Sequence, residues 1–307
     1  MLLQMQSRKT SVDLWHQKPY YSLDAWCKNT YGRKLYKAAL DIGCTCPNRD
    51  GTLDTRGCIF CSAGGSGDFA ASRQLSVTDQ LNQAKALLSS KWTPEPGKPS
   101  LIAYFQAYTN TYGDPDRLLS CYEEALSSPE VAGISIATRP DCLSDIILEG
   151  LDRLQLLYPD RFIWIELGLQ SIHDHTAARI RRGYPTSVFY DAAAKLHARR
   201  LPFIVHLILG LPGETRLDLL ESIRAVNQVH PFGVKLQLLH ILKGTDLALL
   251  YEAGKLPVLT QEEYHDLLTS CIAALSPDIC LHRVTGDGPR KLLIAPHRSL
   301  SKRLVLI

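Results

Sequence analysis

The 307-residue sequence has no long uninterrupted apolar run, no strong charge of either sign, no internal repeat and no low-complexity tract. A membrane-spanning helix needs roughly 18 or more consecutive apolar residues, so the first absence argues against one. The formal net charge of +3 falls far short of the dense positive face that would by itself demand a nucleic-acid partner. Apolar residues make up 45% of the chain, which is enough to fill one large barrel or two ordinary domains.

The first 30 residues also lack a signal-peptide-like apolar segment and an arginine-rich presequence, because charged residues are scattered among aromatic ones. The sequence therefore predicts a cytoplasmic protein. If the source is a plant, a plastid location stays open, although no transit peptide is visible. The nine cysteines argue against a disulfide framework, since cytosolic thiols are kept reduced and the number is odd. We therefore expect closely spaced cysteines to bind a metal ion or cluster.

Apolar runs typical of buried strands alternate with segments of helical periodicity. The expected strands are Lys37–Ile42, Ser100–Gln106, Val131–Ala137, Phe162–Leu167, Phe203–Leu209 and Val234–Leu239. The expected helices are Ser76–Ser89, Asp116–Ser127, Leu143–Leu157, Ser187–Arg200 and Leu217–Val229. This alternation predicts an α/β fold, a partial (β/α)6 TIM-type barrel over residues 36–243. Residues 1–35 and 244–307 would be short N- and C-terminal extensions, and polar clusters at the strand ends would form the active site.

A glycine-rich loop after the first strand carries Cys46, Cys58 and Cys61 in a C-x11-C-x2-C arrangement. Cys58 and Cys61 can face one metal centre across a tight turn, and the intervening loop lets Cys46 supply a third thiolate. Three thiolates on a [4Fe–4S] cluster leave one iron open. S-adenosylmethionine (SAM) can chelate that iron and be cleaved reductively to a 5′-deoxyadenosyl radical.

The alternative is a structural zinc site, which normally has four protein ligands. Cys44 is the one local candidate for the fourth, because no histidine lies between His16 and His173. However, Cys44 and Cys46 would point to opposite sides of an extended strand. The cysteine spacing alone leaves the cluster and zinc interpretations open.

Seven motifs, taken together, resemble the Elongator-catalytic-subunit-like branch of radical SAM proteins, and within it the short bacterial and plastid-type relatives of MnmL. The resemblance covers Tyr31 to Pro289. The motifs are Cys46-Pro-Asn-Arg-Asp-Gly51, Gly57-Cys58-Ile-Phe-Cys61, Tyr104-Phe-Gln-Ala-Tyr-Thr-Asn-Thr111, Ser135-Ile-Ala-Thr-Arg-Pro-Asp141, Glu166-Leu-Gly-Leu-Gln-Ser171, His206-Leu-Ile-Leu-Gly-Leu-Pro-Gly213 and Thr285-Gly-Asp-Gly-Pro289.

The resemblance implies a [4Fe–4S] cluster held by Cys46, Cys58 and Cys61, with SAM as the second cofactor. It also implies an enzyme that remodels the C5 side chain of wobble uridine 34 in tRNA. Such an enzyme would need an electron donor such as ferredoxin or flavodoxin, and a methyltransferase could follow it in the pathway. No membrane partner is expected. The alternatives are a radical SAM oxidoreductase acting on another RNA or a small molecule, and a zinc-stabilised RNA-binding module without catalysis.

Further site residues follow from the same resemblance. The SAM amino end is expected near Gln106, Thr109 and Asn110, at the end of the second strand, and Thr138, at the end of the third strand, is a further cofactor-binding candidate. Turn capping is the ordinary alternative for the first three of these.

Glu166 and Gln170 are expected to face the ribose or methionine moiety of SAM. A glutamate inside an apolar strand is hard to explain without a partner, which favours a functional role for Glu166. Arg182 matches the position expected at the SAM carboxylate, although an arginine in such a run is more often on a solvated helix face.

For His206, a satisfied core histidine is almost as good an interpretation as a role in the pocket. Gly210 would let the backbone approach the adenine closely. Lys235, Gln237 and His240, at the end of the sixth strand, are expected to supply adenine or substrate contacts.

Four features depart from the family pattern. Cys44 stands where the family commonly has a non-ligand residue, which leaves the identity of the first thiolate open. Ala137 stands where the wider branch often has an acidic residue. The tail Arg290–Ile307 diverges, and the acetyltransferase-like domain of the Elongator subunit is missing. Chemistry that needs that domain is not carried over.

Overall fold

The computed structural model describes residues 15–65, 67, 69–88, 97–286 and 288–300. Its main element is a sheet of seven parallel strands in the order β1-β2-β3-β4-β5-β6-β8, curled into a half-barrel. The strands are β1 (Tyr36–Leu40), β2 (Leu101–Phe105), β3 (Val131–Thr138), β4 (Phe162–Gln170), β5 (Phe203–Leu209), β6 (Gly233–Leu238) and β8 (Cys280–Arg283). A separate antiparallel pair joins β7 (Ile241–Leu242) to β9 (Leu293–Ala295).

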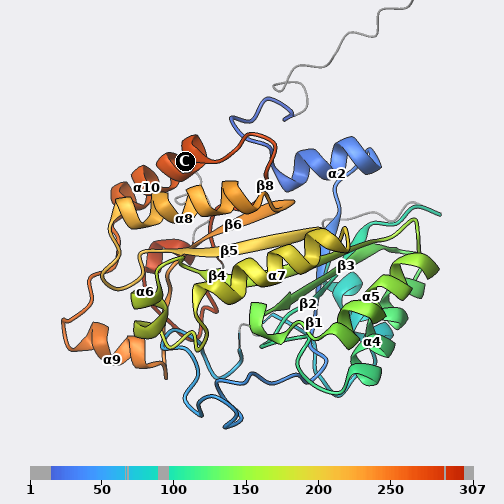
Figure 1. Ribbon diagram of the computed structural model, residues 1–307, viewed down its shortest axis with the longest axis horizontal. Coiled ribbons are helices and arrows are strands. Elements are labelled where there is room, and N and C mark those ends of the chain that lie inside the picture. Colours follow the sequence, from blue (N-terminus) through green and yellow to red (C-terminus); the bar gives the residue numbers. More distant parts are fainter. Residues whose placement is uncertain (1–14, 66, 68, 89–96, 287, 301–307) are drawn as a thin grey trace, which may run out of the picture.

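Helices connect the strands and cover the outside of the sheet (Figure 1). They are α2 (Leu23–Tyr31), α3 (Val77–Leu88), α4 (Pro115–Ser127), α5 (Asp145–Leu157), α6 (Asp174–Arg179), α7 (Thr186–Ala198), α8 (Arg216–Val229), α9 (Asp246–Glu252) and α10 (Gln261–Ala274), with 3-10 turns at Pro140–Cys142 and His297–Leu300. No helix among the described residues combines the length and apolar character needed to cross a bilayer.

The predicted fold class is confirmed, and the six predicted strands and five predicted helices all form within a few residues of their expected bounds. The sheet has one strand more than predicted. β8 comes from the segment assigned to the C-terminal extension and pairs in parallel with β6. Its four residues, Cys-Leu-His-Arg, are too short and too mixed to give a recognisable strand pattern.

Local sequence signals set where the helices begin. Asp114 caps α4 by accepting a hydrogen bond from the Arg117 amide, and Pro115 occupies the first turn, where no amide donor is needed. Thr215 and Thr260 open α8 and α10 with capping boxes, in which the threonine and an acidic residue three positions later bond each other's backbone amides. These caps fix the lengths of the strand-to-helix loops that surround the site.

The two faces of the sheet are packed differently. The outer face packs its Leu, Ile, Val and Phe side chains against the helices in the largest core cluster. At the amino ends of the strands, Trp26 of α2 makes edge contacts with Phe162, Trp164 and Phe232, at ring-centroid distances of 5.5, 4.9 and 5.6 Å. We call these four residues the aromatic plug, because they fill the amino end of the half-barrel.

Candidate functional site

A cavity of about 440 Å³ occupies the inside of the half-barrel toward the carboxyl ends of the strands. Barrel interiors are usually filled by layers of bulky branched side chains. Here the inward positions Ala39 of β1, Ala137 of β3 and Gly168 of β4 line the cavity instead. Because these residues have one side-chain carbon or none, they leave the interior hollow.

Cys46, Cys58 and Cys61 take part in no disulfide and line this cavity together. A tight turn brings the last two close, with the Cys61 amide donating to the Cys58 carbonyl at 3.0 Å. Burial raises the pKa of the Cys58 thiol to about 12, an effect that the neighbouring Cys61 strengthens. The described residues contain no group of three or more Cys, His, Asp or Glu side chains already set at metal-binding geometry. The structure thus brings the three predicted thiols to one cavity, while their ligation of a cluster stays a prediction.

Arg49 holds the cysteine loop in shape. Its Nη2 atom donates to the carbonyl oxygens of Cys61 and Ser62, at 2.7 and 2.8 Å. Gly57 has φ +76°, and a Cβ atom there would lie 2.8 Å from the Arg49 Nε atom. Only glycine therefore fits where the loop crosses this arginine.

Cys44 lies elsewhere. It is 3% exposed, belongs to the large core cluster and does not line the cavity. Burial raises the pKa of its thiol to about 11. In this arrangement Cys44 does not offer the fourth ligand that the zinc alternative needs.

The residues after β2 adopt an unusual backbone. Ala107 and Tyr108 have φ +74° and +60°, a region that non-glycine residues seldom occupy and that concentrates at functional sites. Gln106 and Thr109 line the cavity, and Gln106 Nε2 is buried without a hydrogen-bond partner among the described residues. Asn110 does not line it, since its amide donates to the carbonyls of Ala107 and Ala137 at 3.2 and 3.0 Å. Asn110 therefore acts here as a clamp between the ends of β2 and β3, as the capping alternative anticipated.

Thr138 lines the cavity at the end of β3, with its hydroxyl 2.5 Å from that of Thr111. Gln170 ends β4 at φ +67°, and its Oε1 atom is also buried without a partner in the described part of the chain. An unpartnered donor on Gln106 and an unpartnered acceptor on Gln170 in one cavity suit a polar ligand that provides both complements.

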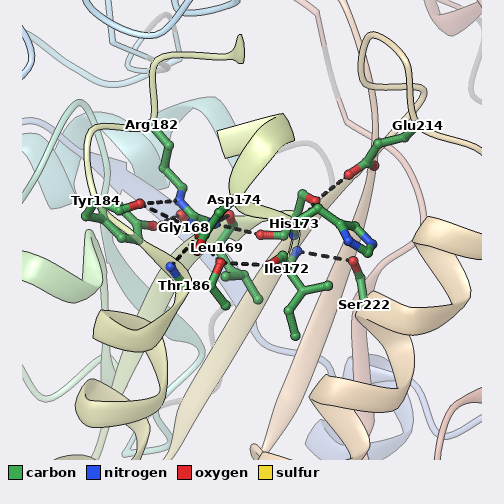
Figure 2. Close-up of polar contacts among 11 residues, drawn as sticks. Gly168, Leu169, Ile172, His173, Asp174, Arg182, Tyr184, Thr186, Glu214 and Ser222 are labelled. Atoms are coloured by element: carbon green, nitrogen blue, oxygen red, sulfur yellow. Dashed lines mark hydrogen bonds and ion pairs between the residues drawn. The ribbon is translucent and has the colours of Figure 1, made fainter. Parts of the chain in front are cut away.

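Arg182 is 2% exposed, and its guanidinium donates mainly to main-chain carbonyl oxygens of other residues (Figure 2). The Nη1 atom donates to the carbonyls of Leu169 and Ser171, at 3.0 and 2.6 Å, and the Nη2 atom donates to Tyr184 at 3.0 Å. Arg182 is thus not on a solvated helix face. It lines the cavity, but its hydrogen bonds tie the segment after α6 to the end of β4.

That segment supports the cysteine loop. The Asn48 side chain donates to the carbonyls of Arg181 and Arg182, at 2.7 and 3.1 Å, and the Ile59 amide donates to Ile180 at 3.2 Å. Arg182 therefore fixes a segment that in turn fixes the loop of Cys58. A role for Arg182 at the SAM carboxylate stays a prediction.

Glu166 is fully buried inside β4 and has four side-chain partners. Its Oε1 atom accepts from Lys37 at 3.0 Å and Ser135 at 2.6 Å. Its Oε2 atom accepts from His206 at 2.8 Å and also from Lys235. Burial alone would raise the pKa of Glu166, but Lys235 and Lys37 hold it well below the ordinary value. The carboxylate is therefore ionised.

Because an ionised carboxylate only accepts hydrogen bonds, His206 must donate from Nε2. Burial, and the Lys235 charge after it, lower the pKa of His206 to about 4, so its ring is neutral near pH 7. His206 is therefore neither an isolated core histidine nor free in the pocket. It completes the shell of Glu166 while still lining the cavity.

Of the remaining predicted residues, Gln237 and His240 line the cavity. Gly210 does not. It has φ +90° and lines a second, shallower hollow of about 240 Å³ beside the start of α8. Its positive φ is a conformation that glycine adopts readily, and its expected approach to the adenine stays a prediction.

Three residues of the cavity floor were not singled out as site candidates by the sequence analysis, Lys37, Tyr104 and Arg283, and they lie beside Lys235. Each occupies an inward position on a strand. The Nζ atoms of Lys37 and Lys235 each lie 4.5 Å from the centre of the Tyr104 ring. A lysine inside Tyr36-Lys-Ala-Ala-Leu40 was the available signal, since an apolar strand seldom carries an unpaired charge.

Comparison with known proteins adds to this geometry. The Radical SAM superfamily pattern matches residues 46–226, and the Radical_SAM C-terminal domain matches residues 231–307. YtqA of Bacillus subtilis (strain 168) is 41% identical over 290 residues, which are 94% of this chain and 88% of YtqA.

Similarity to Elongator complex protein 3 is lower and shorter. The Homo sapiens protein is 25% identical over 169 residues, covering 52% of this chain and 29% of that protein. The structure of the archaeal Methanocaldococcus infernus Elp3 with an N-terminal deletion superimposes with a TM-score of 0.62 at 16% identity, covering 85% of this chain and 58% of that one. The sequence similarity supports an Elp3-like radical SAM branch. The structural similarity supports the fold alone.

Proposed function

The chain belongs to the Radical SAM superfamily, and from this premise we propose that it is an enzyme that remodels the C5 side chain of wobble uridine 34 in tRNA. Its cofactors would be a [4Fe–4S] cluster on Cys46, Cys58 and Cys61, and SAM. The observation that carries the proposal is that these three thiols open onto one hollow barrel, together with two buried glutamine atoms that have no partner among the described residues.

The chemistry supplied when both cofactors are bound is reductive cleavage of SAM to a 5′-deoxyadenosyl radical, which abstracts hydrogen from the substrate. The chain's own residues would bind the cofactors and shield them from bulk water. Arg49 and Asn48 set the shape of the cysteine loop, and Gln106 and Gln170 offer a donor and an acceptor to a polar cofactor. The aromatic plug closes the other end of the barrel, so bulk water has no route from that side.

The tRNA substrate rests on the resemblance to the MnmL-like branch. A barrel open at one end suits an unstacked anticodon base, which can be read and reached there. An electron donor such as ferredoxin or flavodoxin is required to reduce the cluster, and a methyltransferase could act on the product.

The test is anaerobic reconstitution followed by incubation with reductant, SAM and tRNA from a strain that lacks the modification. Mass spectrometry of the nucleosides and chromatography of 5′-deoxyadenosine are read together. We expect both a changed uridine 34 and stoichiometric 5′-deoxyadenosine.

Formation of 5′-deoxyadenosine without any change in tRNA would retain the radical chemistry and reject this substrate, favouring another RNA or a small molecule. Tightly bound zinc in oxygen-free protein, with no iron or sulfide, would reject the radical chemistry itself.

A further inference from the structure

The floor of the cavity carries more positive than negative charge. Three basic side chains line it, Lys37 on β1, Lys235 on β6 and Arg283 on β8, and Glu166 is the carboxylate among them in the described part of the chain. Burial lowers the pKa of Lys235 well below its ordinary value, although the contact with Glu166 opposes this shift. Even without the charge of Lys235, Lys37 and Arg283 together outweigh the single carboxylate. The side chains of Lys37 and Lys235 are 21% and 3% exposed, so little water screens them. The strand register brings these side chains together, because Lys235 pairs directly with His206 of β5 and with Arg283 of β8.

Glu166 cannot neutralise the third cation. Each of its oxygens already accepts from one lysine and one neutral donor, Ser135 or His206. Among the residues that the structure describes, the Arg283 guanidinium has no hydrogen bond and no ion pair. Since His206 is neutral and Tyr104 keeps its proton because burial raises its pKa, no other floor group in the described part of the chain supplies negative charge.

Lys37 and Arg283 are partly buried, and a surplus of positive charge in such a site is costly unless an anion offsets it. The floor is closed beneath by Trp164 and the rest of the aromatic plug, so a compensating group can arrive only through the cavity. The cysteines do not supply it, because they follow the strand ends, whereas Lys37 and Lys235 lie within their strands and Arg283, at the end of β8, pairs with Lys235.

We propose that Lys37, Lys235 and Arg283 form an anion subsite at the cavity floor, which binds a carboxylate carried by the substrate. Lysine and arginine donors give short, charge-assisted hydrogen bonds to such a group, and the planar guanidinium can bind both oxygens at once. The Ala39, Ala137 and Gly168 positions leave the passage by which the group reaches the floor. This subsite does not depend on the substrate being tRNA.

The test measures anion binding by the reconstituted holoenzyme without tRNA. Thermal unfolding is followed in oxygen-free buffer while sodium acetate replaces sodium chloride at constant ionic strength, with acetamide as the neutral analogue and inorganic phosphate as the other oxyanion. We expect acetate to raise the melting temperature in a saturable way, acetamide to have no effect and phosphate to have a smaller one.

Arg283→Gln and Lys37→Met should each weaken acetate binding by about tenfold or more, which corresponds to loss of a charge-assisted hydrogen bond. Arg224→Gln, on the exposed face of α8, is the matched control and should bind acetate as the wild type does. If one of these two variants does not fold, the acetate affinity of the other still tests the subsite.

Equal responses to acetate and acetamide, unchanged acetate affinity in a folded floor variant, or tighter binding of phosphate than of acetate would each overturn the subsite. Its failure would leave uridine modification untouched, since that is read separately from the nucleosides.

Discussion

The two ends of the half-barrel are built from opposite kinds of residue. At the amino end, Trp26, Phe162, Trp164 and Phe232 fill the space with rings. At the carboxyl end, alanine and glycine leave a cavity, and Ala107, Tyr108 and Gln170 hold left-handed backbone conformations. Close packing stabilises a fold, whereas a hollow and strained backbone lower stability and are kept where a ligand binds. The difference teaches that stability and chemistry are separated along the barrel axis.

The sharpest test of this separation is Cys58→Ala. We expect 5′-deoxyadenosine formation to fall below detection, because a cluster that loses a thiolate ligand is not retained in the open-iron state. The melting temperature of the apoprotein should hardly change, since the thiol lies at the cavity and not in the plug. Cys121→Ala on α4, a cysteine outside the cavity, is the control and should keep activity. Product formation by the Cys58 variant at the wild-type rate would contradict the ligand assignment.

Trp164→Ala should give the opposite pattern. Removing a buried tryptophan that stacks on Phe162 at 3.9 Å should lower the free energy of unfolding by about 3–5 kcal/mol. Denaturant titration measures this loss. The fraction that remains folded should still bind iron and sulfide in the wild-type ratio. Loss of iron binding from folded protein would show that the two ends are coupled.

His206 joins the two regions and gives a pH dependence. Its pKa is lowered to about 4 in the folded protein, while the unfolded chain has about 6.5. The unfolded state therefore takes up a proton first as the pH falls, so stability is complete above about pH 6.5 and declines toward pH 4. The decline attributable to His206 is at most about 3 kcal/mol.

His206→Gln keeps a neutral hydrogen-bond donor and should flatten that part of the stability curve, as measured by urea unfolding at a series of pH values. His230→Gln, an exposed histidine at the end of α8, is the control. If the stability of both variants fell equally steeply between pH 6.5 and about pH 4, the pH dependence would belong to groups other than His206.

The smallest effect is expected for Arg49→Lys. A lysine can reach one of the two carbonyls that Arg49 bridges, so the loop should lose about 1 kcal/mol of local stability. Global unfolding should not register the change, but the reconstituted cluster should bleach in air several-fold faster, as followed by visible absorbance. An unchanged bleaching rate would mean that the loop does not depend on this contact.

The sequence was informative wherever neighbouring residues carry the signal. Alternating strands and helices, the caps at Asp114 and Thr215, and the cysteine spacing are all local patterns, and the structure has the elements where they were expected. The strand β8 was missed because its four residues owe their conformation to pairing with β6. Arg182 gave no local sign that its donors would bond to carbonyl groups at the end of β4.

By itself the sequence determined the order of the strands and helices and the residue types available for chemistry, because hydrophobic periodicity and turn chemistry act over a few residues. Only the tertiary structure decided that Lys37, Glu166, Lys235 and Arg283 share one floor, that Cys44 belongs to the core and that the barrel is hollow above the plug. The physical reason is register. Residues far apart in the chain meet only when the parallel strands align, and a shift of one position would turn every one of these side chains to the other face.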